Sequence, residues 1–375
     1  MENFKEPIMV TKSFLPPLNE YMKELERIWD NSWLTNNGEI HNEFEKNLVQ
    51  YLGVPYASLF VNGHLALETA IKSQHLTGQV ITTPFTFTST THAIVNCGLE
   101  PIFCDIEPST YNIDAQKIED LITEKTTAIV PVHVFGNPCD VFEIEKIAKR
   151  HNLKVIYDAA HAFGVEINGV GIGNYGDISM FSMHATKVFH SIEGGVLTYS
   201  DNHHKSFIDL YKNFGISGPE DIELIGINAK MNEFQAAMGL VNIRYVENEI
   251  AKRRELVGVY RYLLKDIKGI TVLEDMVGIK HNYAYFPILV DEESFGMNRN
   301  ELHETLKEYN IFTRKYFYPL ITNMECYSSY KTRYNLPVAE RIANSVLTLP
   351  IYSRLSVDDI EKICSAIKKI HQNLN

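Results

Sequence analysis

The sequence predicts an α/β fold: a large domain with a mostly parallel sheet covered by helices, and a smaller α+β domain after it. Between residues 40 and 200, strand-like and helix-like segments alternate, which favours parallel strands joined by helical crossovers. After Gly195 this pattern changes. The length of 375 residues also exceeds what one hydrophobic core usually holds. We therefore expect a large domain over 1–245, which includes an N-terminal arm, and a small domain over 246–375.

The elements of the large domain follow from the spacing of its apolar residues. Apolar side chains recur at helical spacing at Phe44, Leu48 and Leu52. Helices are expected over 40–52, 64–74, 115–123 and 141–151. Short apolar and β-branched runs predict strands over 80–82, 101–104, 128–132, 154–157 and 178–183. Such runs are typical of a parallel sheet, because both of its faces are buried.

The later part of the chain has fewer and more aromatic elements. Helices are expected over 232–249, 250–267 and 358–374, and the last of these is amphipathic. The aromatic-rich segments 283–290 and 311–318 predict strands or extended chain.

Composition and charge exclude several classes of protein. A content of 45% hydrophobic and 22% charged residues is typical of a folded protein, so disorder is not expected. The formal net charge of −12 argues against nucleic-acid binding, which needs a basic surface. The five scattered cysteines form no CxxC pair and predict reduced, packed thiols. No apolar run suits a signal peptide or a membrane span, so we expect a cytoplasmic protein without membrane contact. We predict no metal site.

Polar residues stand where predicted strands end, and in open parallel sheets ligands bind at these ends. Asp158 follows the strand 154–157, and an acid at the end of a buried strand is costly unless it is paired or functional. The alternative is that Asp158 caps a helix that begins at Ala159. His133 follows the strand 128–132 and is interpreted as a hydrogen-bonded packing residue.

Two further features suggest a cofactor. Lys187 follows the strand 178–183; an amine carried into a partly buried pocket loses solvation, its pKa falls, and it becomes a Schiff-base nucleophile. Gly63 opens the helix 64–74, where free backbone N–H groups form a phosphate site. The alternatives are an exposed loop lysine and an ordinary helix start. A phosphate cradle, an acid for a pyridine nitrogen and a lysine for an aldehyde are together what pyridoxal 5′-phosphate (PLP) requires.

A glycine-rich segment points to a different cofactor. Residues 171–176 fit G-x-G-x-x-G, the dinucleotide fingerprint, which requires a strand before it and a helix after it. Here a hairpin over 165–169 is expected before the glycines and a strand over 178–183 after them. We therefore interpret the glycines as turns. A nucleotide-dependent oxidoreductase stays open on this motif alone.

Several short motifs occur in order along the chain. They are Trp33-Leu34-Thr35-Asn36-Asn37-Gly38, Asn62-Gly63-His64-Leu65-Ala66-Leu67, Thr82-Thr83-Pro84-Phe85-Thr86-Phe87, Pro131-Val132-His133-Val134-Phe135-Gly136, Asp158-Ala159-Ala160-His161-Ala162, Ser182-Met183-His184-Ala185-Thr186-Lys187, Glu193-Gly194-Gly195 and Gly226-Ile227-Asn228-Ala229-Lys230-Met231. On these motifs the chain resembles the DegT/StrS family of sugar aminotransferases over nearly its whole length. The resemblance implies the fold-type I architecture of aspartate aminotransferase, PLP as the cofactor and a homodimer.

The resemblance implies catalytic roles for three residues. Lys187 is similar to the lysine that forms the Schiff base with PLP. Asp158 is similar to the acid that keeps the pyridine nitrogen protonated, so that the ring acts as an electron sink. His161 is similar to the neighbour of the ring hydroxyl. Some relatives carry His in place of the lysine and are dehydratases, so Lys187 favours amino transfer.

Other residues are implied to bind the cofactor by the same resemblance. Phe87 would stack on the ring, and Asn228 would reach the neighbouring subunit's site. The phosphate contacts would come from Gly63, His64 and Ser182. The chain departs from the family pattern at His64, where a small residue or Thr is frequent. It also departs at Lys230, where the usual Arg would offer a bidentate fork.

The motifs also bear on the substrate. Relatives that aminate carbon 4 tend to carry His-x-x-Lys and Glu-Gly-Gly, as residues 184–187 and 193–195 do here, and the segments 15–18 and 314–319 agree with this. The expected acceptor is dTDP-4-keto-6-deoxyglucose, with L-glutamate as donor, in the biosynthesis of amino sugars for surface polysaccharides such as O-antigen. The residues expected to bind substrate are Thr35, His184, Arg314 and Tyr316. A sugar 3-aminotransferase and an enzyme for UDP- or GDP-linked keto sugars stay open.

Two interpretations of the segment 314–318 compete. It is either a strand with solvated charges or the lining of the nucleotide-sugar entrance, with Arg314 near the phosphates and a tyrosine near the sugar. A catalytically silent regulatory protein with the same fold is a further alternative. The presence of both Lys187 and Asp158 argues against it.

Overall fold

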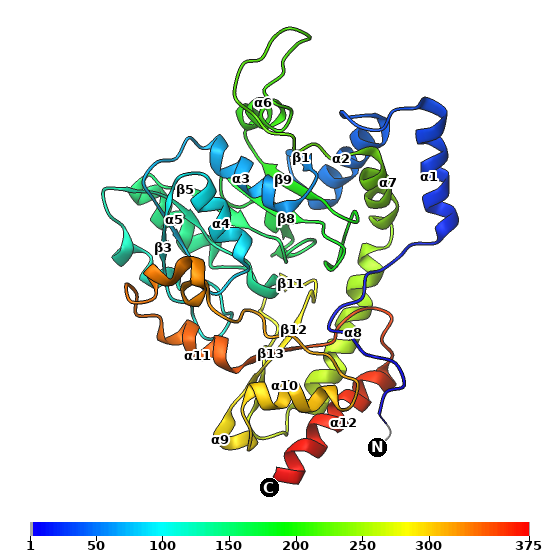
Figure 1. Ribbon diagram of the computed structural model, residues 1–375, viewed down its shortest axis with the longest axis vertical. Coiled ribbons are helices and arrows are strands. Elements are labelled where there is room, and N and C mark those ends of the chain that lie inside the picture. The colour runs from blue at the N-terminus through cyan, green and yellow to red at the C-terminus, as the bar shows by residue number, and fades with distance from the viewer. Residues whose placement is uncertain (1–2, 375) are drawn as a thin grey trace.

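The computed structural model describes residues 3–374 and contains a large sheet and a smaller one, which occupy the upper and lower parts of Figure 1. The large sheet has the strand order β1-β9-β8-β5-β4-β2-β3. Its strands are β1 Tyr56–Phe60, β2 Gln79–Thr82, β3 Glu100–Phe103, β4 Thr126–Val130, β5 Lys154–Asp158, β8 Ile178–Ser182 and β9 Gly195–Tyr199. The pairs from β3 across to β8 are parallel, and β9 is antiparallel to both of its neighbours. The expected mostly parallel sheet is therefore confirmed.

Helices cover both faces of this sheet. One apolar cluster includes α3 Gly63–Ser73, α4 Thr88–Asn96 and α6 Asn202–Tyr211. The cluster on the other face includes α2 Glu39–Leu52, α5 Val141–His151 and α7 Glu233–Asn242. Successive residues of β4 divide between the two clusters, with Ile129 in one and Ala128 and Val130 in the other. Both faces are thus buried, which explains why the central strands are apolar throughout.

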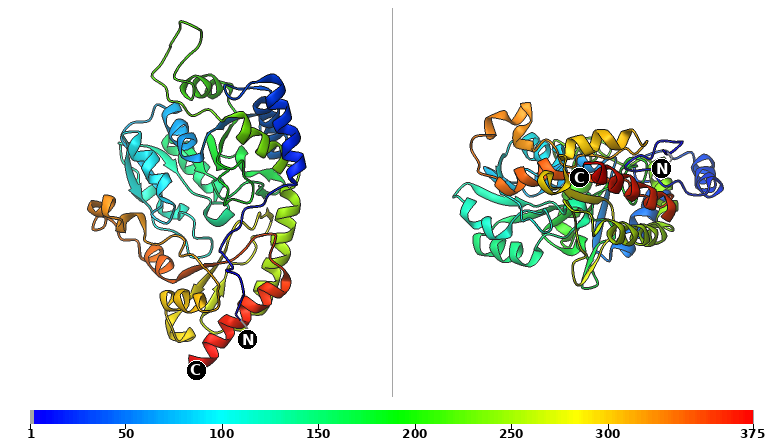
Figure 2. Two further views of the ribbon diagram at one scale, coloured as in Figure 1. Left: turned by 45° about the vertical axis from the view of Figure 1, so that its right-hand side comes forward. Right: turned by 90° about the horizontal axis from the view of Figure 1, so that it is seen from below.

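The smaller sheet has the order β10-β12-β13. Its strands are β10 Ile270–Val272, β12 Phe286–Val290 and β13 Val346–Leu349. The helices of this part are α8 Val246–Leu264, α9 Glu292–Phe295, α10 Arg299–Lys307, α11 Pro337–Ser345 and α12 Val357–Leu374. Before α1 (Leu18–Asn31), the N-terminal arm runs beside α8, and its Ile8 forms an isolated bridge with Ile311, which follows α10 (Figure 2). The division into two domains at residue 245 stays a prediction.

The glycine-rich segment lies next to a third, small sheet. The predicted hairpin is formed by β6 Glu166–Ile167 and β7 Val170–Gly171, and β11 Ile279–Lys280 pairs with β6. A 3-10 turn over 172–174 follows, and then β8. The glycines therefore lead into a strand instead of a helix, so their interpretation as turns is confirmed.

Two predicted helices differ from the structure. The segment 115–123 forms two 3-10 turns, because the Asp114 side chain accepts from the Gln116 N–H at 3.1 Å and closes a tight turn at its start. The predicted helix 232–249 ends at Asn242, and α8 begins at Val246. The Asn242 side chain donates to the His190 carbonyl at 2.9 Å, which fixes the turn between α7 and α8.

The cysteines Cys97, Cys104, Cys139, Cys326 and Cys364 are free thiols. Over residues 3–374, no helix combines the length and the apolar character that crossing a bilayer requires.

Candidate active site

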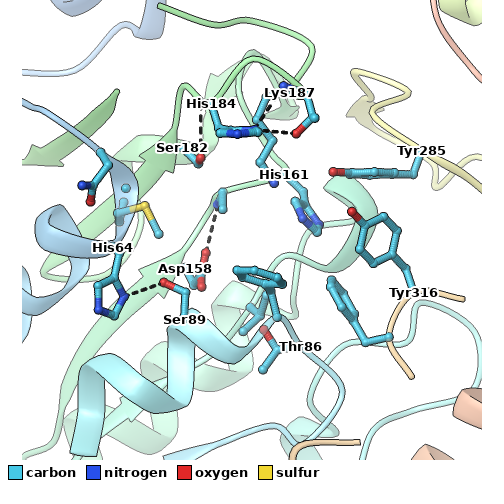
Figure 3. A pocket seen from close by; sticks show the side chains of 18 of the residues that line it. His64, Thr86, Ser89, Asp158, His161, Ser182, His184, Lys187, Tyr285 and Tyr316 are labelled. Carbon is cyan, nitrogen blue, oxygen red and sulfur yellow. Dashed lines mark hydrogen bonds between the residues drawn. The ribbon is translucent and has the colours of Figure 1, made fainter. Parts of the chain in front are cut away.

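A cavity of about 290 Å³ opens at the carboxyl ends of β5 and β8. The first turns of α3 and α4 form one side of it, and aromatic residues from the later part of the chain form another. Figure 3 shows the side chains that converge there. The predicted site residues that line this cavity are Gly63, His64, Phe87, Asp158, His161, Ser182, His184, Lys187, Arg314 and Tyr316. The cavity therefore lies at the carboxyl ends of the strands, where ligands bind in open parallel sheets, as we expected from the sequence.

Asp158 is the last residue of β5 and is only 4% exposed. Its Oδ2 accepts a hydrogen bond from the Thr90 hydroxyl at 2.7 Å, and its Oδ1 accepts from the Ala160 N–H at 3.1 Å. Burial raises the pKa of this carboxyl, and the two hydrogen bonds oppose that rise. No helix begins at Ala159, so the alternative of a helix cap is excluded. Asp158 is an acid held at the cavity by donors on two sides.

Lys187 follows β8 and projects into the same cavity (Figure 3). Its Nζ lies 5.9 Å from the centre of the Tyr285 ring. Burial lowers the pKa of this amine to about 8, although the nearby Tyr316 and Asp158 raise it in part. A lysine with such a pKa is half unprotonated at about pH 8 and mostly unprotonated above it, whereas an ordinary lysine stays protonated there; a nucleophilic amine requires the unprotonated form.

His161 lies among aromatic rings on the cavity wall. Its Nδ1 accepts the Phe135 N–H at 3.2 Å, so the proton of the neutral ring is on Nε2. Its ring centre is 4.8 Å from that of Tyr285 and 5.7 Å from that of Phe317, on which it stacks. Burial lowers the pKa of His161 well below its ordinary value, so the ring is neutral. His161 therefore offers one N–H donor to the cavity.

The start of α3 forms an anion site. The Asn62 side chain caps this helix by accepting the Leu65 N–H at 2.9 Å, and the N–H groups of the first turn have no partner within the helix. A Cβ on Gly63 would stand 3.2 Å from the Ser182 Cβ and 3.3 Å from the Met180 sulfur, so glycine permits β8 to approach. The Ser182 hydroxyl faces the same space, and the site suits a phosphate.

The His64 side chain does not offer a free donor to this phosphate site. Its Nδ1 is 2.8 Å from the Ser89 hydroxyl, and its Nε2 is 3.0 Å from a Glu68 carboxylate oxygen. Both ring nitrogens are therefore engaged. A phosphate contact from His64 would come from its backbone N–H.

His184 and Glu193 face each other at the cavity. The Thr186 N–H donates to His184 Nδ1 at 3.2 Å, so the proton of the neutral ring is on Nε2. This Nε2 lies 3.5 Å from Glu193 Oε1, and both side chains are about half exposed. They offer polar partners to a hydroxylated ligand.

Arg314 supplies a cation at the same cavity. Its guanidinium lies 4.4 Å from the centre of the Tyr316 ring, and Tyr316 in turn contacts Tyr285 edge-on. Lys315 points elsewhere and donates to Asn300 at 2.8 Å. Arg314 is bridged to Thr348 of β13, but residues 315–318 form a turn in which the Tyr318 N–H donates to the Lys315 carbonyl at 2.9 Å, so the predicted extended segment 311–318 does not continue to its end. Arg314, Tyr316 and Phe317 line the cavity, as the second interpretation of this segment requires.

The residues present fit PLP. The Phe87 ring is 54% exposed at the cavity wall, which leaves an aromatic face free for a planar ligand. Asp158 suits a protonated ring nitrogen, His161 a ring oxygen, Lys187 an aldehyde and the α3 start a phosphate. Within the described residues 3–374, no group of His, Cys, Asp and Glu side chains is arranged to hold a metal ion.

Two predicted residues lie away from this cavity. Thr35 is on the exposed loop before α2. Asn228 is exposed at the end of the loop that follows α6 and projects from the top of Figure 1; its Oδ1 accepts from Lys230 at 3.0 Å. An Asn228 that acts in a neighbouring subunit would lie outside its own cavity, as found. Thr35 has no contact that explains its predicted role.

Sequence reasoning missed several residues of the site. Ser89 and Thr90 follow the recognised motif at 82–87, and their position in a hydroxyl-rich first helical turn was a usable signal. Tyr285 lies in a segment predicted only as extended and aromatic, and Phe317 lies in the segment 314–318, for which a role was predicted for Arg314 and a tyrosine but not for Phe317. Nothing in the local pattern shows that these two rings meet His161. His133, in contrast, is fully buried, accepts from the Cys139 N–H at 3.0 Å and stacks on Tyr157, in agreement with a packing role.

Comparisons with known proteins agree with this geometry. A profile of the DegT/DnrJ/EryC1/StrS aminotransferase family matches residues 18–368. The chain is 47% identical over 359 residues to a dTDP-4-amino-4,6-dideoxy-D-glucose transaminase of Escherichia coli, covering 95% of this chain and 96% of the relative. It is 46% identical over 366 residues to a Shigella dysenteriae protein of the same name, covering 98% and 100%. Among solved structures, DesI in the presence of its TDP-sugar product is 33% identical with a TM-score of 0.94, covering 99% of this chain and 94% of that one.

Proposed function

This chain belongs to the DegT/DnrJ/EryC1/StrS aminotransferase family and is a PLP-dependent aminotransferase, and we propose that it transfers an amino group from L-glutamate to carbon 4 of dTDP-4-keto-6-deoxy-D-glucose. The observation that carries this choice of substrate is the 47% and 46% identity to two dTDP-4-amino-4,6-dideoxy-D-glucose transaminases over nearly their full lengths. The product would be dTDP-4-amino-4,6-dideoxy-D-glucose, an amino sugar for a surface polysaccharide such as O-antigen.

The cavity divides into regions that suit the parts of these ligands. The first turn of α3 and Ser182 would hold the phosphate of the cofactor, and Phe87 would cover one ring face. His184 and Glu193 face each other at a half-exposed edge, where they would meet the sugar hydroxyls. Arg314 is the cation that would meet the diphosphate of the nucleotide sugar.

When bound, PLP supplies a carbonyl carbon that carries the amino group between two substrates and a ring that accepts the electron pair released by proton removal. Lys187 would act as the base and the acid: its Nζ has a pKa of about 8 and is mostly unprotonated above that pH, so it would remove a proton from the amino donor and return one to the sugar carbon. Asp158 would hold the proton on the ring nitrogen, and His161 would donate its Nε2–H to the ring oxygen.

The active unit in this proposal is a homodimer. The loop that carries Asn228 and Lys230 projects away from the large sheet (Figure 1). No described residue of this loop lines the cavity of its own subunit. Exposed apolar residues on and around α1 add a surface that suits a second copy; they include Leu15, Leu18, Met22, Trp29 and Trp33. Asn228 would complete the neighbouring subunit's cofactor site.

A panel assay tests the proposed substrate. The protein, loaded with PLP, is incubated with L-glutamate and with dTDP-, UDP- and GDP-linked 4-keto-6-deoxy sugars, and kcat/KM is measured for each. The proposal expects the dTDP-linked sugar to be preferred over the other nucleotides. A higher kcat/KM with a GDP- or UDP-linked sugar would reject the nucleotide, and preference for the free keto sugar would reject the substrate class.

A further inference from the structure

Thr90 joins helix α4 to the acid of the site. It is the third residue of α4 and is fully buried. Its Oγ1 lies 2.7 Å from Asp158 Oδ2 and 2.8 Å from Thr86 Oγ1. A threonine in a helix commonly turns its hydroxyl back onto a carbonyl of the same helix. Here the hydroxyl is directed across to the end of β5 instead.

The direction of these hydrogen bonds follows from the protons available. An ionised carboxylate only accepts, so Thr90 donates its single hydroxyl proton to Asp158. Thr90 can then only accept from Thr86, which becomes the donor of that pair. Thr86 is itself 2% exposed and lines the cavity. A one-way chain of hydroxyl groups therefore runs from Thr86 through Thr90 to Asp158.

Among residues 3–374, the Thr90 hydroxyl is the only donor to Asp158 Oδ2, the oxygen at which this series of hydroxyl groups ends. The Ala160 N–H binds Oδ1, whereas Thr90 binds Oδ2. Without Thr90, one oxygen of a buried carboxylate would have no protein donor, and the carboxylate would become more basic. A more basic carboxylate competes more strongly for a proton that it shares with a ring nitrogen.

We propose that Thr90 is a positioning residue that keeps Asp158 ionised and aimed at the ring nitrogen of the bound cofactor. The inference rests on the proposed function only for the identity of that cofactor. Removing the Thr90 hydroxyl moves the shared proton from the ring nitrogen to Asp158. The ring then loses its positive charge, and with it the capacity to take up an electron pair.

The neighbouring residue offers a matched control. Thr91 is also fully buried in α4, but its hydroxyl has no hydrogen-bond partner within the described structure. Replacing threonine by valine exchanges a hydroxyl for a methyl group of similar shape. Thr91→Val thus removes a buried unpaired hydroxyl, which is neutral or stabilising. Thr90→Val makes the same change one position away and removes a donor to the carboxylate.

The test measures the protonation state of the ring nitrogen directly and does not depend on turnover. Each variant is loaded with PLP labelled with ¹⁵N in the ring, and the ¹⁵N resonance is compared with that of the wild type. Wild type, Thr91→Val and Thr90→Ser should give a pyridinium resonance. Thr90→Val should shift toward neutral pyridine, and its kcat should fall about tenfold to a hundredfold, as expected for a lost hydrogen bond to a charged group.

An unchanged resonance in folded, PLP-loaded Thr90→Val overturns the proposal, and so does an equal shift in Thr91→Val. If Thr90→Val does not fold, Thr86→Val replaces it, because it removes the donor to Thr90. A smaller shift in the same direction is then expected, and no shift overturns the proposal. A wild-type protein that binds no PLP would instead reject the proposed function.

Discussion

The amine of Lys187 lies 5.9 Å from the centre of the Tyr285 ring, at a cavity that also contains the buried carboxylate of Asp158. This relationship joins the end of β8 to an aromatic residue just before β12, two segments far apart in the sequence. Burial at this position lowers the pKa of Lys187 to about 8. Several expectations about the chemistry follow from this position.

The first concerns pH. Only the unprotonated amine attacks an aldehyde, and the pKa of Lys187 is lowered from 10.5 to about 8. The rate at which PLP combines with the apoprotein should therefore rise about tenfold per pH unit below pH 8 and level off above it. Stopped-flow absorbance measures this rate. A rate that keeps rising to pH 10 would show that the amine retains its ordinary pKa.

The second concerns the acid. Asp158→Asn keeps the shape of the side chain but removes the charge that holds the proton on the ring nitrogen. We expect kcat to fall on the order of 10²-fold or more, as for other losses of a preorganised electrostatic contact. Steady-state kinetics at saturating PLP checks this, with Glu293→Gln on exposed α9 as a control that leaves kcat unchanged. Turnover close to wild type in Asp158→Asn would remove the proposed role.

The third concerns assembly. Lys187→Ala and Asn228→Ala should each be inactive as homodimers, because each has two defective sites. In a randomly mixed dimer one site is intact, so an equimolar mixture should recover about a quarter of wild-type activity. Subunits are exchanged under mild denaturation and assayed after dilution. A mixture no more active than its components, or a fully active monomer in light scattering, would contradict the shared site.

The fourth concerns the nucleotide sugar. Arg314→Ala removes the cation that stands over the Tyr316 ring. The KM for the nucleotide sugar should rise about tenfold to a hundredfold, the value of a charged hydrogen bond, and more than the KM for glutamate. Lys315→Ala is the matched control, because its amine is bonded to Asn300. Unchanged KM values in Arg314→Ala would mean that the diphosphate binds elsewhere.

Much of the fold could be predicted from the sequence because the central strands are buried on both faces. A continuous apolar run such as Ala128 to Val132 is typical of a central strand in a parallel sheet, and the polar residue after each run marks the edge of the sheet where ligands bind. Asp158 and Lys187 could be singled out on this basis. The break between α7 and α8 could not, since it depends on a hydrogen bond from Asn242 to the distant His190.

The rest of the site depends on contacts between distant segments. Tyr285 and Phe317 contact His161 although they lie more than 120 positions after it in the sequence, so the contact depends on how the later part of the chain packs against the large domain. The bond from Thr90 to Asp158 likewise joins residues 68 positions apart. Local pattern places Thr90 in a helix but does not show which way its hydroxyl turns.

The position of the transferred nitrogen tests the central claim most directly. The PLP-loaded protein is incubated with ¹⁵N-labelled L-glutamate and dTDP-4-keto-6-deoxy-D-glucose, and the product is examined by NMR. We predict ¹⁵N bonded to carbon 4 of the sugar, and no such product from Lys187→Ala. Nitrogen at carbon 3, or a sugar that takes up no ¹⁵N, would contradict it.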